Sequence, residues 1–240
     1  MTAYETLLHF LRYPLNTSEG IFQRFQEMHG ARLFGHGNER ALYIAGSRAK
    51  KVLLIAHADT FWDEDNSAMG ETKLEIESGR IHNPLGGLGA DDRAGCALVW
   101  MLKDSGHAIL ITSGEEHGSL ASKWLTENRP DVIDEINDAH QFMVQFDRGN
   151  GREFKCYDVG SDAFRQYVAH CSSYREPDRE RSTDIRYLCK TISGVNLSIG
   201  YHDEHTEEEY LVLEEWQHTL EMTRGWLGQP DLPLFRLGKT

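Results

Sequence analysis

The stretch KVLLIAHAD, residues 51–59, decides the fold class of this 240-residue chain. Its apolar part, Val52–Ile55, is continuous and does not alternate with polar residues, which is typical of a strand covered on both faces of a sheet. More strands of this kind are predicted at Ala108–Thr112, Phe142–Phe146 and Val195–Ile199. Segments with helical spacing separate them. This alternation predicts an α/β fold, a three-layer sandwich in which helices flank a mixed, mostly parallel central sheet.

The remaining segments complete this pattern. A further strand is expected at Ala41–Ala45, and one hairpin, Lys73–Ile81, is expected within the polar, Gly-rich loop of residues 61–88. Helices are predicted at residues 2–12, 16–29, 92–102, 119–127, 161–171, 183–189 and 207–226. No internal repeat and no shift in composition marks a linker, so residues 1–240 are expected to form one domain.

The charge balance and the cysteines restrict the class of protein. Lys and Arg number 25 against 38 Asp and Glu, a net charge of −13, which disfavours a nucleic acid or a membrane as partner and suits metal cations. No apolar run is long enough to span a membrane, and the N-terminus lacks the pattern of a signal peptide. The four cysteines are far apart and form no C-x-x-C pair. A cytoplasmic protein with reduced thiols is therefore expected.

Side chains that bind metals follow the predicted strands. In open α/β sheets, ligands bind beyond the carboxyl ends of the strands. The residues at those positions are imidazoles and carboxylates: His57 and Asp59, Asp91 and Asp92, Glu115 and Glu116, Asp147, and His202 and His205. The sequence therefore predicts a site rich in carboxylates at one edge of the sheet.

Each of these motifs alone has a simpler structural explanation. A single His after a strand is usually a surface or capping residue, Glu115 and Glu116 could complement a helix dipole, and Asp91 and Asp92 could form an N-cap pair. Together they would be costly to bring to one place without a cation. Imidazole and carboxylate without thiolate fit two divalent ions, with Zn²⁺ first and Co²⁺ or Mn²⁺ as alternatives. One His per ion makes a bridging Asp the simplest way to complete both coordination shells.

Four motifs in this order resemble those of the co-catalytic dizinc exopeptidases. The motifs are residues 57–59 (HAD), 89–95 (GADDRAG), 114–118 (GEEHG) and 205–209 (HTEEE). The clan includes bacterial dizinc aminopeptidases, glutamyl aminopeptidases, peptidase T and dizinc carboxypeptidases. Leu8–Pro14 also resembles its usual N-terminal helix, so the resemblance spans residues from about 5 to 226. The gaps 61–88 and 147–205 are too short for the inserted domain of many relatives, which implies a catalytic domain alone, without a lid or dimerisation domain.

The resemblance implies five metal ligands: His57, Asp91, Glu116, Asp147 and His205. Asp91 would bridge the two ions. His205 is preferred to His202 because the His of the family stands four residues before a Glu, and Glu209 stands at that distance from His205. Residue 206, four positions after His202, is a threonine.

The resemblance also implies the catalytic roles. Glu115 would be the general base that takes a proton from a water between the metals and passes it to the leaving amine. Asp59 would orient His57 through the free ring N–H. The peptide bond between the two aspartates of the GADD motif is expected to be cis. Substrate contacts are predicted for Asp184, Arg148 and His202.

Three functions remain open at this point. The first is a dizinc aminopeptidase that hydrolyses N-terminal or small-peptide amide bonds, since the acidic surface favours a free α-amino group over a carboxylate. The second is an amidohydrolase that deacylates N-acyl amino acids with the same site. The third is an inactive metal-binding protein of this fold, which is disfavoured because Glu115 and the five ligands are all present. The sequence predicts no oligomeric state.

Overall fold

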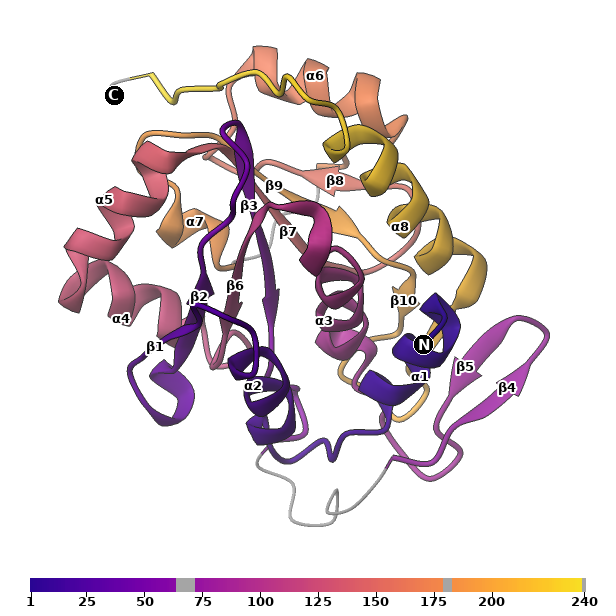
Figure 1. Ribbon diagram of the computed structural model, residues 1–240. Coiled ribbons are helices and arrows are strands. Elements are labelled where there is room, and N and C mark those ends of the chain that lie inside the picture. The colour runs from indigo at the N-terminus through magenta and orange to yellow at the C-terminus, as the bar shows by residue number, and fades with distance from the viewer. Residues whose placement is uncertain (64–71, 179–182, 239–240) are drawn as a thin grey trace.

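A computed structural model describes residues 1–63, 72–178 and 183–238 of the chain (Figure 1). Its central sheet has the strand order β1-β2-β6-β3-β7-β9-β8. The strands are β1 (Arg32–Phe34), β2 (Ala41–Ile44), β3 (Lys51–His57), β6 (Ala108–Thr112), β7 (His140–Arg148), β8 (Phe154–Lys155) and β9 (Gly194–Ser198). The pairs among β6, β3, β7 and β9 are parallel, and the pairs toward both edges are antiparallel. The predicted mixed sheet with a parallel centre is confirmed.

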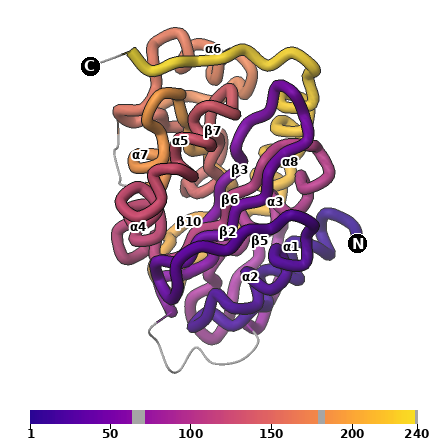
Figure 2. The backbone as a smooth tube through the Cα atoms, turned by 60° about the vertical axis from the view of Figure 1, so that its left-hand side comes forward, coloured from indigo at the N-terminus to yellow at the C-terminus, as the bar shows by residue number. Residues whose placement is uncertain are grey.

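Helices cover both faces of this sheet. One face packs against α1 (Ala3–Leu11), α2 (Glu19–Gln26), α3 (Ala90–Met101), α6 (Asp162–Ser172) and α8 (Leu213–Leu227). The other face packs against α4 (Leu120–Asn128), α5 (Pro130–Ala139) and α7 (Ile185–Leu188). Figure 2 shows β2, β3 and β6 between α4, α5 and α7 on one side and α1, α3 and α8 on the other. Short 3-10 helices lie at Gly37–Glu39 (η1) and Lys103–Ser105 (η3).

The apolar run of residues 52–55 in β3 occupies the centre of the molecule. Val52 and Leu54 belong to the core on the α1 and α3 side, whereas Leu53 and Ile55 belong to the core on the α4 and α5 side. All four are fully buried. Burial of each such side chain contributes about 1.5–3 kcal/mol, so a continuous run is stabilising only in a strand that has helices on both faces.

A second, smaller sheet corrects one prediction. Its strand order is β10-β11-β5-β4, with β4 (Glu75–Glu77), β5 (Arg80–His82), β10 (Tyr201–His202) and β11 (Tyr210–Val212). The hairpin expected at residues 73–81 is confirmed as β4 and β5. The helix expected at 207–226 is wrong in its first part, because α8 begins at Leu213. Leu211 is buried and pairs with Ile81 of β5, a distant partner that the local spacing does not reveal.

Several elements have no counterpart in the expectations from the sequence. These are α5, which has Pro130 in its first turn, the edge strands β1 and β8 of the central sheet, β10 of the smaller sheet, and the 3-10 helices η1 and η3. The α3 segment starts at Ala90, but Asp91 and Asp92 have non-helical backbone angles, so its regular helical part follows Asp92, close to the expected start. Within the described ranges, no helix is long and apolar enough to cross a membrane.

The parallel strands end together at one edge of the sheet. β3 ends at His57, β6 at Thr112, β7 at Arg148 and β9 at Ser198. The loops that leave this edge bring together residues that are far apart in the sequence, as expected for an open α/β sheet.

Candidate metal centre

The structure brings all five predicted ligands to the carboxyl edge of the sheet. They form two groups, and within each group the possible ligand atoms lie within 4.8 Å of one another. The first metal group is His57, Asp91 and Asp147, and the second metal group is Asp91, Glu116 and His205. Asp91 belongs to both groups. His57 comes from β3, Asp91 from the start of α3, Asp147 from β7, and the other two from loops after β6 and β10.

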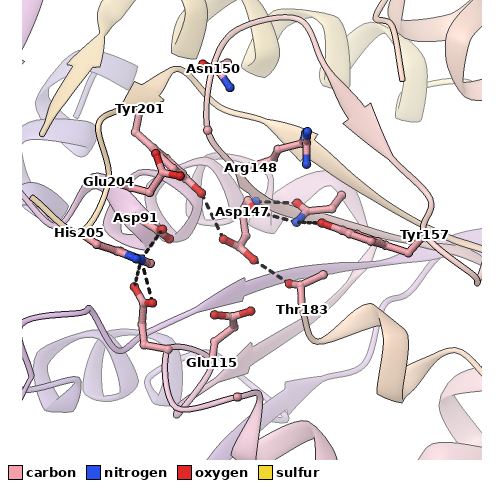
Figure 3. A pocket seen from close by; sticks show the side chains of 14 residues that line it. Asp91, Glu115, Asp147, Arg148, Asn150, Tyr157, Thr183, Tyr201, Glu204 and His205 are labelled. Atoms are coloured by element: carbon pink, nitrogen blue, oxygen red, sulfur yellow. Dashed lines mark hydrogen bonds and ion pairs between the residues drawn. The ribbon is translucent and has the colours of Figure 1, made fainter. Parts of the chain in front are cut away.

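The two carboxylate oxygens of Asp91 face different histidines, of which Figure 3 draws His205. Oδ1 lies 3.1 Å from Nε2 of His57, and Oδ2 lies 3.3 Å from Nε2 of His205. Asp147 Oδ1 is 3.4 Å from the same atom of His57, and Glu116 Oε2 is 2.9 Å from Nε2 of His205. A carboxylate placed between two histidines in this way could contribute one oxygen to each of two ions.

Crowding of these carboxylates shifts their pKa values. Burial and the charge of Asp91 raise the pKa of Glu116 to about 7. Burial and the charge of Asp147 raise the pKa of Glu115 well above its ordinary value. Burial lowers the pKa of His205, but hydrogen bonds with Asp91 and Glu116 outweigh it and raise the pKa to about 10. The site therefore favours positive charge, which protons supply here and divalent ions would supply more fully.

The donor set fits two divalent ions. Each group offers one imidazole nitrogen and carboxylate oxygens, and no thiolate belongs to either group of the described residues. Such ligands suit zinc, cobalt or manganese and do not select one of them by chemistry alone.

The backbone around Asp91 is held by two buried carboxylates. The peptide bond between Asp91 and Asp92 is cis, which confirms that prediction. Glu209 accepts hydrogen bonds from the backbone N–H groups of Leu88, Gly89 and Asp91 at 3.1, 2.7 and 3.0 Å. Asp92 accepts the backbone N–H of His57 at 3.0 Å. The sequence marks Glu209 only by its spacing from His205, and its contact with the Asp91 turn comes from the structure.

Asp147 is held by polar residues that sequence reasoning missed. Thr183 Oγ1 and Gln145 Nε2 donate to its Oδ2 at 2.7 and 2.9 Å, and the Tyr201 hydroxyl donates to Oδ1 at 3.4 Å. Asn196 binds its backbone on both sides, at N and O. Gln145 and Asn196 are buried polar residues within otherwise apolar strands. A polar residue that interrupts an apolar run is the sequence feature from which these two residues could have been predicted.

Asp59 lies where the predicted orienting residue should be. Its Oδ1 is 3.4 Å and its backbone oxygen 3.1 Å from Nδ1 of His57, the ring nitrogen that faces away from the metal groups. Its Oδ2 accepts the backbone N–H of Glu116 at 3.1 Å. Asp59 thus links His57 of one metal group to Glu116 of the other.

A cavity of about 260 Å³ opens beside the two groups. Glu115 lines it but belongs to neither metal group, as a general base requires. Glu204, from the loop before His205, lines it as well. Figure 3 shows Glu115 on the side of Asp147 toward Thr183.

The three predicted substrate contacts have different outcomes. Arg148 lines the cavity. Asp184 does not, because it is fully buried and accepts hydrogen bonds from the hydroxyls of Thr112 and Ser122, each at 2.6 Å. His202 is also outside the lining, since it pairs with Glu215 at 2.8 Å. These contacts tie Asp184 and His202 into the fold, so the geometry does not support them as substrate contacts.

Comparisons with known proteins point to the fold. No family model matches the sequence, and no curated protein matches it. In structure the chain is similar to the aminopeptidase PepT from Bacillus cereus ATCC 10987, with a TM-score of 0.66, 14% identity, and 95% of this chain and 98% of that chain covered. It is similar to a tripeptidase from Staphylococcus aureus subsp. aureus Mu50, with a TM-score of 0.66, 13% identity and coverage of 94% and 97%.

The TET1 peptidase of Pyrococcus horikoshii has the same architecture, with a TM-score of 0.67, 12% identity, and 94% of this chain and 99% of that chain covered. At such low identities the likeness concerns the fold and not the activity. The chain therefore has the α/β fold of these peptidases, as the resemblance of its motifs implies.

Proposed function

We propose that this protein is a metal-dependent aminopeptidase with two divalent ions, most simply Zn²⁺. The observation that carries the proposal is the pair of groups joined by Asp91, beside a third carboxylate, Glu115, that is outside both. In this proposal His57, Asp147, Glu116 and His205 complete the ligand set. The fold shared with aminopeptidases and a tripeptidase supports the same reading.

Ions bound there would polarise the scissile carbonyl and lower the pKa of an attacking water. The residues of the chain supply the proton transfers and the orientation. Glu115 takes the proton of the water and passes it to the leaving amine, and its raised pKa suits a group that must both accept and donate near neutral pH. Asp59 fixes the ring of His57. Thr183 and Gln145 fix the carboxylate of Asp147.

Glu204 supports an aminopeptidase over a deacylase. It lines the cavity and belongs to neither metal group. A carboxylate at that place is a suitable partner for the protonated α-amino group of a peptide, which an N-acyl amino acid lacks. We therefore propose that Glu204 binds the free N-terminus of the substrate.

We also propose that residues 1–240 form a single catalytic domain, into which no lid or dimerisation domain is inserted. Between Asp147 and His205 the described chain forms β8, α6, α7, β9 and β10, which belong to the two sheets and the helical layers already described. The absence of membrane and nucleic-acid partners, and a cytoplasmic location, remain predictions from the sequence.

Hydrolysis assays on metal-reconstituted protein test this function. Aminoacyl-coumarin substrates and their N-acetylated counterparts would be compared with zinc, cobalt or manganese added. The expected result is turnover of the free-amine set only, and a Glu204→Gln variant is expected to raise KM for that set. Turnover of the acetylated set alone would make the protein a deacylase. No turnover by protein that binds both ions would make it an inactive member of the fold.

A further inference from the structure

The cavity beside the metal groups has one strong cation in its wall. Arg148 is the only lysine or arginine among the described residues that line it. The carboxylates that line the same cavity are Asp91, Glu115, Glu116, Asp147 and Glu204. The chemistry proposed above assigns no role to this guanidinium.

Arg148 is buried and its hydrogen bonds are incomplete. The side chain is 7% exposed, and its Nη2 is 3.4 Å from Oε2 of Glu153. Its Nε has no hydrogen-bond partner within the described part of the chain. Glu153 also pairs with Arg175 at 3.3 Å, so one carboxylate serves two guanidinium groups and the trio keeps a net positive charge. A buried guanidinium with an unused N–H is costly unless a bound molecule completes its contacts.

The groups near Arg148 are also suited to an anion. Tyr157 and Asn150 line the same cavity. The Tyr157 hydroxyl accepts a hydrogen bond from Asn196 Nδ2 at 3.5 Å and another from Arg148 itself, which leaves the hydroxyl proton to donate. The Asn150 amide offers two further N–H donors. A planar guanidinium matches a carboxylate with two parallel hydrogen bonds, so a carboxylate is the anion that fits best.

We propose that Arg148 anchors a carboxylate of the substrate, so that the protein prefers amides that carry a carboxylate close to the scissile bond. This inference rests on the proposed function. Arg148 directly follows Asp147 along β7. Both side chains line the same cavity, so a carboxylate anchored by Arg148 would share that cavity with a carbonyl held at the metal groups.

Two parts of a substrate can supply that carboxylate. One is the side chain of an N-terminal Glu or Asp, and the other is the free α-carboxylate that follows the scissile bond in a dipeptide or an N-acyl amino acid. In the view of Figure 3, Arg148 and Glu115 lie on opposite sides of Asp147. Because Glu115 delivers its proton to the leaving amine, the opposite side belongs to the acyl half of the substrate. This geometry favours the side chain of an N-terminal acidic residue.

Two pairs of substrates test the anchor. Glutamyl- and glutaminyl-coumarin differ only in the side-chain charge, and the dipeptide Gln-Ala and its C-terminal amide differ only in the α-carboxylate. For the wild type, we expect kcat/KM to be at least about tenfold higher for the glutamyl member, the discrimination that a charge-assisted hydrogen bond gives. Arg148→Gln should bring the ratio close to one, and Arg148→Lys should restore part of it.

Arg175→Gln is the matched control. Arg175 shares Glu153 with Arg148, but its side chain is 83% exposed and it does not line the cavity. This variant should keep the ratio of the wild type. Metal content and Tm of each variant would show that the fold and the metal groups are intact.

The outcomes separate this inference from the proposed function. A preference within the second pair alone, lost in Arg148→Gln, would keep the anchor and assign it to the α-carboxylate. Equal rates within both pairs, or a preference that survives in Arg148→Gln, would overturn the anchor while hydrolysis itself stands. If no amide is hydrolysed, the proposed function fails. Calorimetric titration of the metal-loaded protein with glutamate and with glutamine then decides the anchor, and equal affinities would overturn it.

Discussion

The backbone N–H of Asp91 donates a 3.0 Å hydrogen bond to Oε1 of Glu209. The other oxygen of Glu209 accepts the N–H groups of Leu88 and Gly89. This buried carboxylate, with its three backbone donors, fixes the turn that presents Asp91. Glu209 stands four residues after His205 in the sequence. One side chain outside both metal groups thus joins the turn that presents Asp91 to the chain segment that carries His205.

Substitution Glu209→Gln should weaken metal binding, because Asp91 belongs to both groups and its turn is held by Glu209. The amide has one acceptor oxygen where the carboxylate has two, so its NH₂ would oppose a backbone N–H of the turn. We expect an affinity loss of about 10- to 100-fold, the usual effect of disturbing the support of a ligand. Calorimetric zinc titration would show it as weaker binding. Glu208→Gln, an exposed neighbour, is the control, and an unaltered titration curve for Glu209→Gln would contradict this role.

Substitution Glu115→Gln should abolish most of the activity without loss of metal. Loss of a general base costs about 10²- to 10⁴-fold in kcat. Glu115 lies outside both groups, so elemental analysis should still find both ions. Glu127→Gln, at an exposed position of α4, should behave as the wild type. Turnover of Glu115→Gln within threefold of the wild type would be incompatible with the mechanism.

The metal-free protein should lose stability as the pH rises. Burial raises the pKa of Asp184 to about 6, of Glu116 to about 7 and of Glu209 to about 8. A carboxyl whose pKa is raised by folding contributes stability that is full below its unfolded pKa, near 4, and is lost as the pH passes its folded pKa. Thermal unfolding with a chelator should therefore give a Tm several degrees lower at pH 8.5 than at pH 5.5.

Divalent ions should reverse part of this effect, since of the three carboxyl groups only Glu116 belongs to a metal group, and an ion there would replace its proton. Unfolding with zinc or cobalt added at the same two pH values provides the comparison. A chelated protein that is more stable at pH 8.5 than at pH 5.5 would show that the crowded carboxylates are not the cause.

Substitution Leu54→Ala should destabilise the centre of the sheet. Leu54 is fully buried in β3 between α3 and the neighbouring strands. Such truncations cost about 2–5 kcal/mol in the free energy of unfolding. Leu85→Ala, at a side chain that is 80% exposed, should cost no more than about 0.5 kcal/mol. Urea denaturation measures both, and equal effects would argue against the central position of β3.

The sequence predicts the centre of the fold better than its margins. β3 could be predicted as a strand because consecutive apolar residues indicate burial on both of its faces. β11 reads as part of a helix, since its identity as a strand depends on Ile81, more than a hundred residues earlier. Short edge strands such as β1 and β8 have too few residues to show any period.

The candidate site follows the same division. Its five candidate metal ligands could be predicted because each follows a strand or belongs to a motif with fixed spacing. The supporting contacts of Gln145 and Asn196 could not, because they depend on which strands become neighbours. The burial of Asp184 could not be predicted either, since its position before a helix gives no sign that the hydroxyls of Thr112 and Ser122 bind it.

The shared carboxylate of Asp91 has a thermodynamic consequence. Each of its oxygens faces one metal group, so an ion in one group changes the charge and the position of a ligand of the other. Occupancy of the two groups is then linked, and the linkage is reciprocal: the first ion alters the affinity for the second by the same factor as the second alters the affinity for the first. Stepwise removal of metal by a chelator would therefore not follow two independent binding curves.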